Sequence, residues 1–450
     1  MATEVARERK ERRALRQDRT PPSPPDGTDS NVVADKRPAS RERARGARRA
    51  HAQVAEHAVF LVPGLLGFDH FANFGYFADR VAAALRAGLE QTCEQPVPVI
   101  ALPIPPTASL YHRQRMLVRS LADRLHALEH GQRPLQVHLV GHSTGGLDAN
   151  LLTDDKPLRE RESDPDQTWG DIDPRAPALR DRIRSVVSIA SPHQGACITR
   201  DPLALFASCH DLRGLPALLA VSTKFVTTSL YDLELSDLAY GFGRDARTAA
   251  RFLMDVALKW ELLPDLRPTR RPCTERLAPD VVRRSFITVA GRATPGVSSN
   301  PRADALFRDF SDRASGWKTG CAEEGELVQR SVARLRTALA SAAANELVIK
   351  APGAELPSEL DAGHNDGVVN SARQLMNPDD ADELAGIVVG DHFDVAGHYD
   401  RRLWVLDRDG HEQSKQVLSG LLHSGSGFRD DQFFELYRRV ADVIAGAIRR

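Results

Sequence analysis

The chain has 450 residues, of which 42% are hydrophobic and 27% charged, and its formal net charge at pH 7 is −1. These values are typical of a globular protein and exclude a wholly disordered, collagen-like or membrane-embedded chain. The length suffices for one large α/β domain with insertions. The near-zero net charge gives no reason to expect specific binding of nucleic acid.

The N-terminal part differs in composition from the rest of the chain. Residues 1–51 contain 14 Lys and Arg against 8 Asp and Glu, a local charge of +6, whereas the remainder carries about −7. Residues 1–55 lack hydrophobic periodicity and include PPSPP and RERARGARR, so we expect a disordered basic tail, with a tether to a polyanion or a surface as the alternative. The tail has no apolar stretch typical of a secretory signal, and no apolar run in the chain could span a bilayer. We therefore expect a cytoplasmic protein and leave secretion by another route open.

Residues 56–450 alternate short apolar segments, which predict buried strands, with amphipathic segments, which predict helices. The expected strands lie within residues 58–62, 96–104, 136–140, 183–192, 284–292 and 385–392. The expected helices lie near residues 76–89, 112–129, 323–344 and 432–449, with one more beginning near Gly146. Apolar strands that alternate with helices predict a mostly parallel sheet covered by helices on both faces.

Two long stretches interrupt this alternation. Residues 196–280 contain the segment DPLALFASCHDLRGLPALLAVSTKF, which is rich in leucine and poor in charge, and we expect a lid-like insertion at 196–280. Its apolar side chains could line a site for an acyl chain or form an extra layer of the core. These side chains are Leu203, Leu205, Phe206, Leu212, Leu215, Leu218 and Leu219. Residues 293–365, which carry a helix and then a Pro- and Gly-containing loop, form a second expected insertion.

The cysteines are scattered along the chain and form no Cys-x-x-Cys pair. They are Cys93, Cys197, Cys209, Cys273 and Cys321. An odd number cannot be paired completely within one chain, so neither a disulfide scaffold nor a metal cluster is expected. We expect free thiols, with a single disulfide as the alternative.

Residues 141–145 read Gly-His-Ser-Thr-Gly and match the G-x-S-x-G pattern of a nucleophile elbow. They follow the strand expected at 136–140 and precede the helix expected near Gly146, which is the strand–turn–helix context that the motif requires. Glycines two residues before and after the serine leave room for the strand and the helix to approach each other. We therefore expect Ser143 to be a nucleophile.

A serine hydroxyl needs a histidine base, and the base needs a carboxylate that fixes its tautomer. On a sheet with such an elbow, the acid and then the histidine follow the serine along the chain. His392 comes directly after an apolar strand, where catalytic loops emerge, and His398 is the alternative base. Asp366 lies in an Asn-Asp-Gly turn followed by apolar residues, with Asp361 and Asp391 as the alternative acids.

Five motifs occur in the order typical of bacterial true lipases of the Pseudomonas/Burkholderia type, which the sequence resembles over residues 58–394. The motifs are VFLVPGLLGFDHF, VHLVGHSTGG, SIASPHQG, HNDGVV and DHFD. The lipases of that type have the α/β-hydrolase fold and act on acylglycerols, so the resemblance implies the same fold and a lipid ester as substrate.

The resemblance also implies roles for individual residues. It makes Ser143 the nucleophile, Asp366 the acid and His392 the base. It places an oxyanion hole at the backbone N–H groups of Leu65 and Thr144, and the second donor agrees with the general rule for the residue after the nucleophile.

The sequence departs from that family at the first turn and leaves a metal site open. Pro63 and Gly64 stand where the family usually has His-Gly, which removes a hydrogen bond beside the oxyanion hole but keeps the Leu65 amide. Relatives often hold a structural calcium near the histidine, and Asp394 occupies the matching position, with Glu346 as the candidate second ligand. No other cofactor is expected.

We therefore expect a serine carboxylic ester hydrolase, a lipase or esterase that acts on acylglycerols or similar lipid esters through an acyl-enzyme and contacts a lipid surface transiently. One alternative keeps the same triad in an intracellular polyester, thioester or phospholipid hydrolase or an acyltransferase. Another is a non-catalytic hydrolase-like scaffold whose basic tail binds a polyanionic partner.

Overall fold

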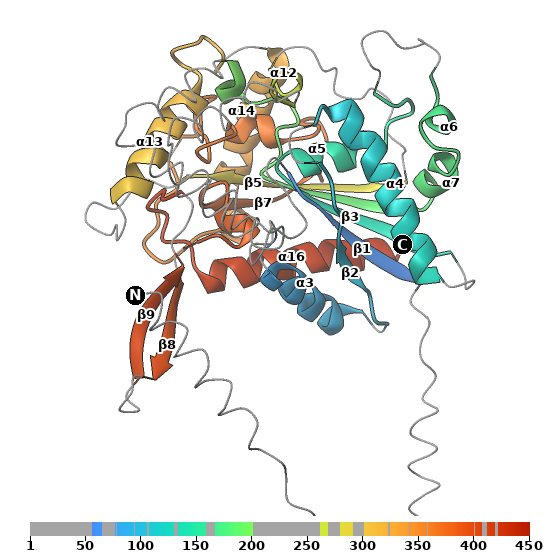
Figure 1. Cartoon of the computed structure of the whole chain (residues 1–450). Coiled ribbons are helices and arrows are strands. Elements are labelled where there is room, and N and C mark those ends of the chain that lie inside the picture. The colour runs from blue at the N-terminus through green and yellow to red at the C-terminus, as the bar shows by residue number, and fades with distance from the viewer. Residues whose placement is uncertain are drawn as a thin grey trace, which may run out of the picture. The chain divides into compact units, whose positions relative to one another are not determined.

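A computed structural model gives the structure of the chain (Figure 1). It describes residues 56–64, 77, 79–93, 95–105, 108–129, 134–158, 167–200, 262–268, 280–290, 301–322, 325–341, 343–357, 359–399, 401–406, 412–418 and 422–450. The expected basic tail, the Leu65 amide and the leucine-rich residues 203–219 lie outside these ranges, so they stay predictions.

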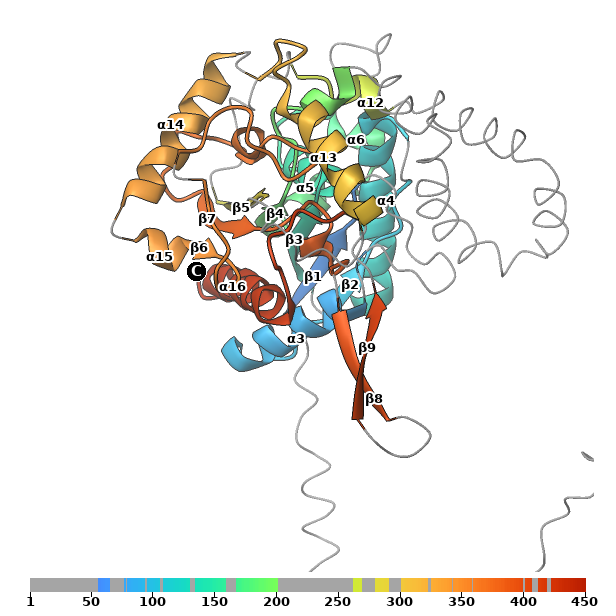
Figure 2. The same cartoon turned by 90° about the vertical axis from the view of Figure 1, so that its left-hand side faces the viewer.

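Seven strands form one sheet in the order β2-β1-β3-β4-β5-β7-β6, and every neighbouring pair in it is parallel. The strands are β1 (His57–Val62), β2 (Val99–Ala101), β3 (Gln136–His142), β4 (Ile183–Ile189), β5 (Val282–Val289), β6 (Val348–Ile349) and β7 (Leu384–Val389). Strands β8 (Arg401–Leu406) and β9 (Glu412–Leu418) form a separate antiparallel hairpin, which extends away from the sheet in both views (Figures 1 and 2).

Helices cover both faces of the sheet. The described α-helices are α3 (Asp79–Thr92), α4 (Leu110–Glu129), α5 (Thr144–Leu151), α6 (Trp169–Ile172), α7 (Ala176–Arg180), α12 (Leu262–Asp265), α13 (Pro301–Ser315), α14 (Glu326–Ala340), α15 (Ala344–Leu347) and α16 (Asp430–Ile448). Short 3₁₀ turns lie at η2 (Cys197–Arg200), η4 (Ser371–Gln374) and η5 (Asp394–Ala396). Helices α3 and α16 lie side by side on one face, whereas α4 and α5 lie on the other (Figures 1 and 2).

The core consists of two apolar layers, one on each side of the sheet. Successive strand side chains point to opposite faces, so Val59 and Leu61 of β1 cluster with Val440 of α16. Phe60 of the same strand clusters with Leu121 of α4 on the other face. A further cluster extends this second layer between β5, β7 and helix α14. Burial on both faces explains why these strands are almost continuously apolar in sequence.

The structure confirms the predicted α/β-hydrolase fold: a parallel sheet lies between helices, and a serine turn follows β3 and leads directly into α5. The strand expected at residues 96–104 is shorter, since only Val99–Ala101 pairs with β1. Strand β6, helix α13 and the hairpin β8–β9 are elements that the sequence did not reveal. Strand β6 is two residues long, too short to give an apolar pattern of its own.

The expectation of free thiols was wrong for Cys197 and Cys321, and the alternative of a single disulfide applies to them. Cys197 of η2 and Cys321, in the loop after α13, form a disulfide with a Cα–Cα distance of 5.8 Å, and Cys93 is a free thiol. The two paired residues are 124 positions apart in sequence. Their pairing depends on how the loop after β4 meets the loop after α13, which no local pattern encodes.

Among the described residues, no helix combines the length and the hydropathy that a membrane-spanning segment requires.

Candidate active site

Ser143 occupies a sharp turn between β3 and α5. Its backbone has φ 55° and ψ −133°, a positive-φ conformation that a non-glycine residue adopts only at a cost. Its N–H donates to the carbonyl of Ile189 at the end of β4 (2.9 Å), which anchors the turn to the neighbouring strand. The residue as a whole is 5% exposed. The turn therefore holds the hydroxyl in a fixed direction at the carboxyl edge of the sheet.

The glycines around Ser143 are required by close packing. A Cβ atom on Gly141 would lie 2.4 Å from the backbone of Gly145, and one on Gly145 would lie 2.0 Å from the carbonyl oxygen of Val62. Both contacts involve backbone, which cannot move aside as a flexible side chain can. The glycine pattern of the motif thus follows from the crossing of β1, β3 and the first turn of α5.

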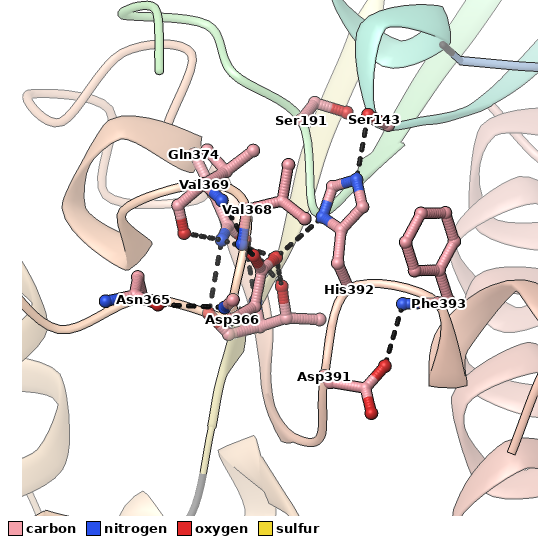
Figure 3. A network of polar contacts seen from close by, with 12 residues as sticks. Ser143, Ser191, Asn365, Asp366, Val368, Val369, Gln374, Asp391, His392 and Phe393 are labelled. Carbon is pink, nitrogen blue, oxygen red and sulfur yellow. Dashed lines mark hydrogen bonds and ion pairs between the residues drawn. The ribbon is translucent and has the colours of Figure 1, made fainter. Parts of the chain in front are cut away.

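Ser143, His392 and Asp366 form one hydrogen-bonded chain (Figure 3). His392 Nε2 lies 2.9 Å from Ser143 Oγ, and His392 Nδ1 lies 2.9 Å from Asp366 Oδ2. Because an ionised carboxylate only accepts hydrogen bonds, Nδ1 carries the proton and Nε2 is left to accept the serine proton. Ser143 lies in the loop after β3, Asp366 in the loop before β7 and His392 in the loop after β7.

The Asp366 carboxylate is completely buried and accepts hydrogen bonds on both oxygens. Oδ1 accepts the backbone N–H groups of Val368 (3.0 Å) and Val369 (2.8 Å). Besides His392, Oδ2 accepts the hydroxyl of Thr288 (2.5 Å) and the side-chain amide of Gln374 (3.2 Å). A buried carboxylate is stable only when its lone pairs are satisfied, and these donors provide that.

A second histidine supports the loop that carries His392. His142, directly before the nucleophile, is fully buried, and its Nε2 donates to the backbone carbonyl of His392 (2.8 Å). The two rings lie with their centroids 4.8 Å apart. Burial, with the nearby His392, holds the pKa of His142 well below its usual value, so the ring stays neutral. The backbone N–H of His392 donates in turn to the carbonyl of Asp366 (2.9 Å).

Thr144 is the first residue of α5, and its backbone N–H belongs to the first turn of that helix. The first N–H groups of a helix have no partner within the helix and attract negative charge. This geometry suits an oxyanion donor beside Ser143. The side-chain hydroxyl of Thr144 is buried and makes no hydrogen bond within the described part of the chain. Leu65, the other expected donor, lies outside that part.

The alternative acids and base occupy other positions. Asp361 accepts the backbone N–H groups of Gly363 (2.8 Å) and His364 (3.1 Å). Asp391 accepts the N–H of Phe393 (3.0 Å; Figure 3). His398 lies further along, where its backbone N–H donates to the Phe393 carbonyl (3.1 Å). The ring that contacts Ser143 is that of His392.

Asp394, the expected calcium ligand, is engaged locally. Its Oδ2 accepts the backbone N–H of Asp391 (2.8 Å) and lies 3.4 Å from the hydroxyl of Ser426. Burial and the Asp394 carboxylate raise the pKa of Asp391 well above its usual value. Glu346, the other candidate ligand, lies exposed on α15. Among the described residues, no three His, Cys, Asp or Glu side chains converge on a point that could hold a metal ion, and calcium stays a prediction.

Three residues that sequence reasoning did not single out complete the site: His142, Thr288 and Gln374. Thr288 lies on β5, next to β7 in the sheet, and Gln374 lies on η4. His142 belongs to the elbow motif itself, so its position beside the serine was a signal that could have been followed. Nothing in the sequence marks Thr288 or Gln374, because both reach Asp366 through the fold.

No protein-family model matches the sequence, and no curated protein matches it. The structure is similar to that of EstA from Clostridium botulinum, with a TM-score of 0.43 and 14% identity over 89% of this chain and 90% of that chain. The lipase of Staphylococcus hyicus gives 0.41 and 13%, over 88% of this chain and 98% of that one. A metagenomic carboxyl esterase gives 0.39 and 15%, over 88% and 77%. At these values the similarities identify neither a family nor a substrate, and the Pseudomonas/Burkholderia type stays a prediction.

Proposed function

We propose that the chain is a serine carboxylic ester hydrolase in which Ser143 is the nucleophile, His392 the general base and Asp366 the residue that orients the base. The observation that carries this proposal is the hydrogen-bonded chain from the Ser143 hydroxyl through His392 to the buried Asp366 carboxylate. The positive φ of Ser143 supports it, because strained backbone of this kind occurs where a side chain must be presented for reaction.

The first half of the reaction forms an acyl-enzyme. His392 Nε2 takes the proton of Ser143 as Oγ attacks the ester carbonyl, and the imidazolium is stabilised by Asp366. Negative charge develops on the carbonyl oxygen, where the N–H of Thr144 and the expected N–H of Leu65 donate to it. His392 then gives its proton to the leaving alcohol, and the C–O bond of the ester breaks.

The second half repeats the sequence with water. His392 takes a proton from a water molecule, which attacks the acyl-enzyme carbonyl, and the same donors hold the oxyanion. Collapse of this intermediate returns the proton to Ser143 Oγ and releases the carboxylic acid. Every proton transfer uses His392 Nε2, so the tautomer that Asp366 enforces is needed in both halves.

For the substrate, we propose acylglycerols or similar lipid esters. The support is the resemblance of the five sequence motifs to bacterial true lipases, together with a leucine-rich segment at residues 203–219. The triad itself is compatible with thioesters, polyesters, phospholipids and acyl transfer to an alcohol, and these are the alternatives that the experiment has to separate.

The test measures hydrolysis of p-nitrophenyl esters from acetate to palmitate and of tributyrin and triolein emulsions. Ser143→Ala should lower kcat by at least about 10⁴-fold. Ser191→Ala is the matched control, because Ser191 is also buried and lies close to Ser143 (Figure 3) but donates to the carbonyl of Ile189 (3.2 Å). A serine-directed phosphonate should label Ser143 and not Ser191.

Each alternative function predicts a different result in these assays. Preference for long acyl chains or emulsions supports a lipase, and turnover of short soluble esters alone supports an esterase. Activity on thioesters, polyester or phospholipid with none on acylglycerols replaces the proposed substrate but keeps the mechanism. A wild-type protein that hydrolyses nothing and takes up no phosphonate contradicts the proposal and favours the non-catalytic scaffold.

A further inference from the structure

Arg113 is a completely buried arginine on the first turn of α4, and its guanidinium joins three separate segments. Nε and Nη2 donate to Asp148 Oδ2 on α5 (2.9 and 2.6 Å). Nη2 also donates to the backbone carbonyl of Pro63 after β1 (2.7 Å), and Nη1 donates to that of Pro105 after β2 (2.6 Å). One planar group thus fixes the helix after the nucleophile relative to the exits of two strands.

Two of these segments, α5 and the chain after β1, carry the expected oxyanion donors. Asp148 lies one turn beyond Thr144 on α5, and Pro63 lies two residues before Leu65. The contact between the two segments is tight, because the carbonyl of Val62 lies where a Cβ on Gly145 would have to go. The position of the Thr144 N–H therefore depends on how α5 is held against the backbone that leaves β1.

The ion pair is not explained by stability alone. Both side chains are 0% exposed, and desolvation of a buried pair consumes much of the attraction between its charges, so apolar residues of similar volume stabilise a fold about as well. An arginine, however, presents its donors in a rigid fork that sets directions and distances, which neither an apolar side chain nor a lysine can reproduce.

We propose that Arg113, held by Asp148, is a positioning residue that holds the start of α5, with Ser143 and the Thr144 N–H, in place against the backbone that leaves β1 at Pro63. This proposal rests on the proposed function and deepens it. Arg113 touches no reacting atom; it acts through the Pro63 carbonyl and through α5. Because the oxyanion exists only in the transition state, a misplaced donor weakens binding of the transition state more than binding of the ester.

The test compares Arg113→Lys with Arg180→Lys as the matched control. Arg180 also donates to backbone carbonyls, at Leu152 (2.9 Å) and Asp154, and so holds the opposite end of α5 away from Ser143. A lysine at position 113 keeps the charge but loses the fork. Asp148→Asn is the second variant and keeps the test open if Arg113→Lys does not fold. The side-chain oxygen of asparagine can still accept a hydrogen bond from Arg113.

The readouts are kcat and KM for a soluble p-nitrophenyl ester, normalised to active sites titrated with a phosphonate, and inhibition by an alkylboronic acid that mimics the tetrahedral state. Arg113→Lys should lower kcat about 10²-fold with little change in KM, as expected for a displacement of about 1 Å. Boronate affinity should fall with kcat/KM. Asp148→Asn should give a smaller loss of the same kind, and Arg180→Lys should change the melting temperature only.

A result in which Arg113→Lys and Asp148→Asn keep the wild-type kcat per titrated site and the wild-type boronate affinity overturns the positioning role, even if both melt earlier. The same holds if Arg180→Lys lowers kcat as much as Arg113→Lys. A failure of the proposed function looks different: the wild-type protein itself then hydrolyses no ester and takes up no phosphonate, and the positioning role falls with it.

Discussion

Asparagine has nearly the same shape as aspartate but no charge. Asp366→Asn therefore tests the charge of Asp366 and its control of the His392 tautomer with the shape of the side chain kept. In the wild type, Oδ1 accepts two backbone N–H groups, and Oδ2 accepts Thr288, Gln374 and His392. Asparagine has one oxygen and one NH₂ group. The backbone N–H groups cannot rotate, so the amide oxygen has to face them, and the NH₂ group takes the place of Oδ2.

The NH₂ group then points at His392 Nδ1, which has to become an acceptor. The imidazole proton moves to Nε2, where it faces Ser143 Oγ, and the ring can no longer take the serine proton. We expect kcat of Asp366→Asn to fall about 10⁴-fold, equivalent to about 5.5 kcal/mol of transition-state stabilisation, with KM nearly unchanged. Thr288→Val removes one donor to Oδ2 but keeps the tautomer, so it should cost less than about 10-fold.

The assay is steady-state hydrolysis of a soluble p-nitrophenyl ester at pH 8, with folding checked by the melting temperature and by phosphonate titration. If folded Asp366→Asn keeps a kcat within about 10-fold of wild type, the tautomer argument is refuted. An equal loss in Thr288→Val would also refute it, because that variant leaves the carboxylate in place.

Three further predictions concern stability. Cys197→Ser/Cys321→Ser opens a loop that spans 124 positions, and the chain-entropy relation gives a loss of about 5 kcal/mol in unfolding free energy, measurable in urea; a loss below about 1 kcal/mol would contradict it. His138 and His57 lie 3.0 Å apart between ring nitrogens, and burial together with His57 lowers the pKa of His138 to about 3. The contribution of the neutral His138 ring to the unfolding free energy is therefore complete above pH 6.5. It is lost at about 1.4 kcal/mol per pH unit as the pH falls toward 3, because the unfolded state binds the proton first. His138→Gln should flatten the pH dependence of the melting temperature, and an unchanged slope would count against this. Thr144→Val removes a buried hydroxyl without a partner among the described residues, so the melting temperature should rise and the activity persist; a fall in kcat above 10-fold would assign the hydroxyl a catalytic role.

The part of the site that could be predicted from sequence is the part encoded locally. The elbow at Ser143 is a backbone feature whose strand, glycines and helix follow one another in sequence, so the motif can be read directly, although the carbonyl that excludes a Cβ from Gly145 belongs to Val62. His392 could be found because it directly follows an apolar strand that turns out to be β7. The disulfide could not be found, because nothing near Cys197 or Cys321 in sequence indicates that their loops meet.

The surroundings of Asp366 illustrate the remaining gap. Strands β5 and β7 are neighbours in the sheet although α13, α14 and β6 separate them in sequence. That pairing brings the hydroxyl of Thr288 to the turn before β7, and η4 brings the amide of Gln374 to the same oxygen. A threonine in a strand and a glutamine in a turn are both common, so neither indicates a role until the sheet order is known.

The groups that donate hydrogen bonds to Asp366 also determine how its negative charge is balanced. Apart from His392, every group that donates to its carboxylate in the described part of the chain is neutral: two backbone amides, one hydroxyl and one side-chain amide. Fixed dipoles satisfy the lone pairs without cancelling the negative charge, whereas an arginine or lysine in their place would neutralise it. In the proposed mechanism, the imidazolium that forms when His392 takes the serine proton is therefore the group that balances the charge of Asp366. The buried carboxylate is thus arranged to favour the transition state over the resting state, which is the condition for it to raise kcat.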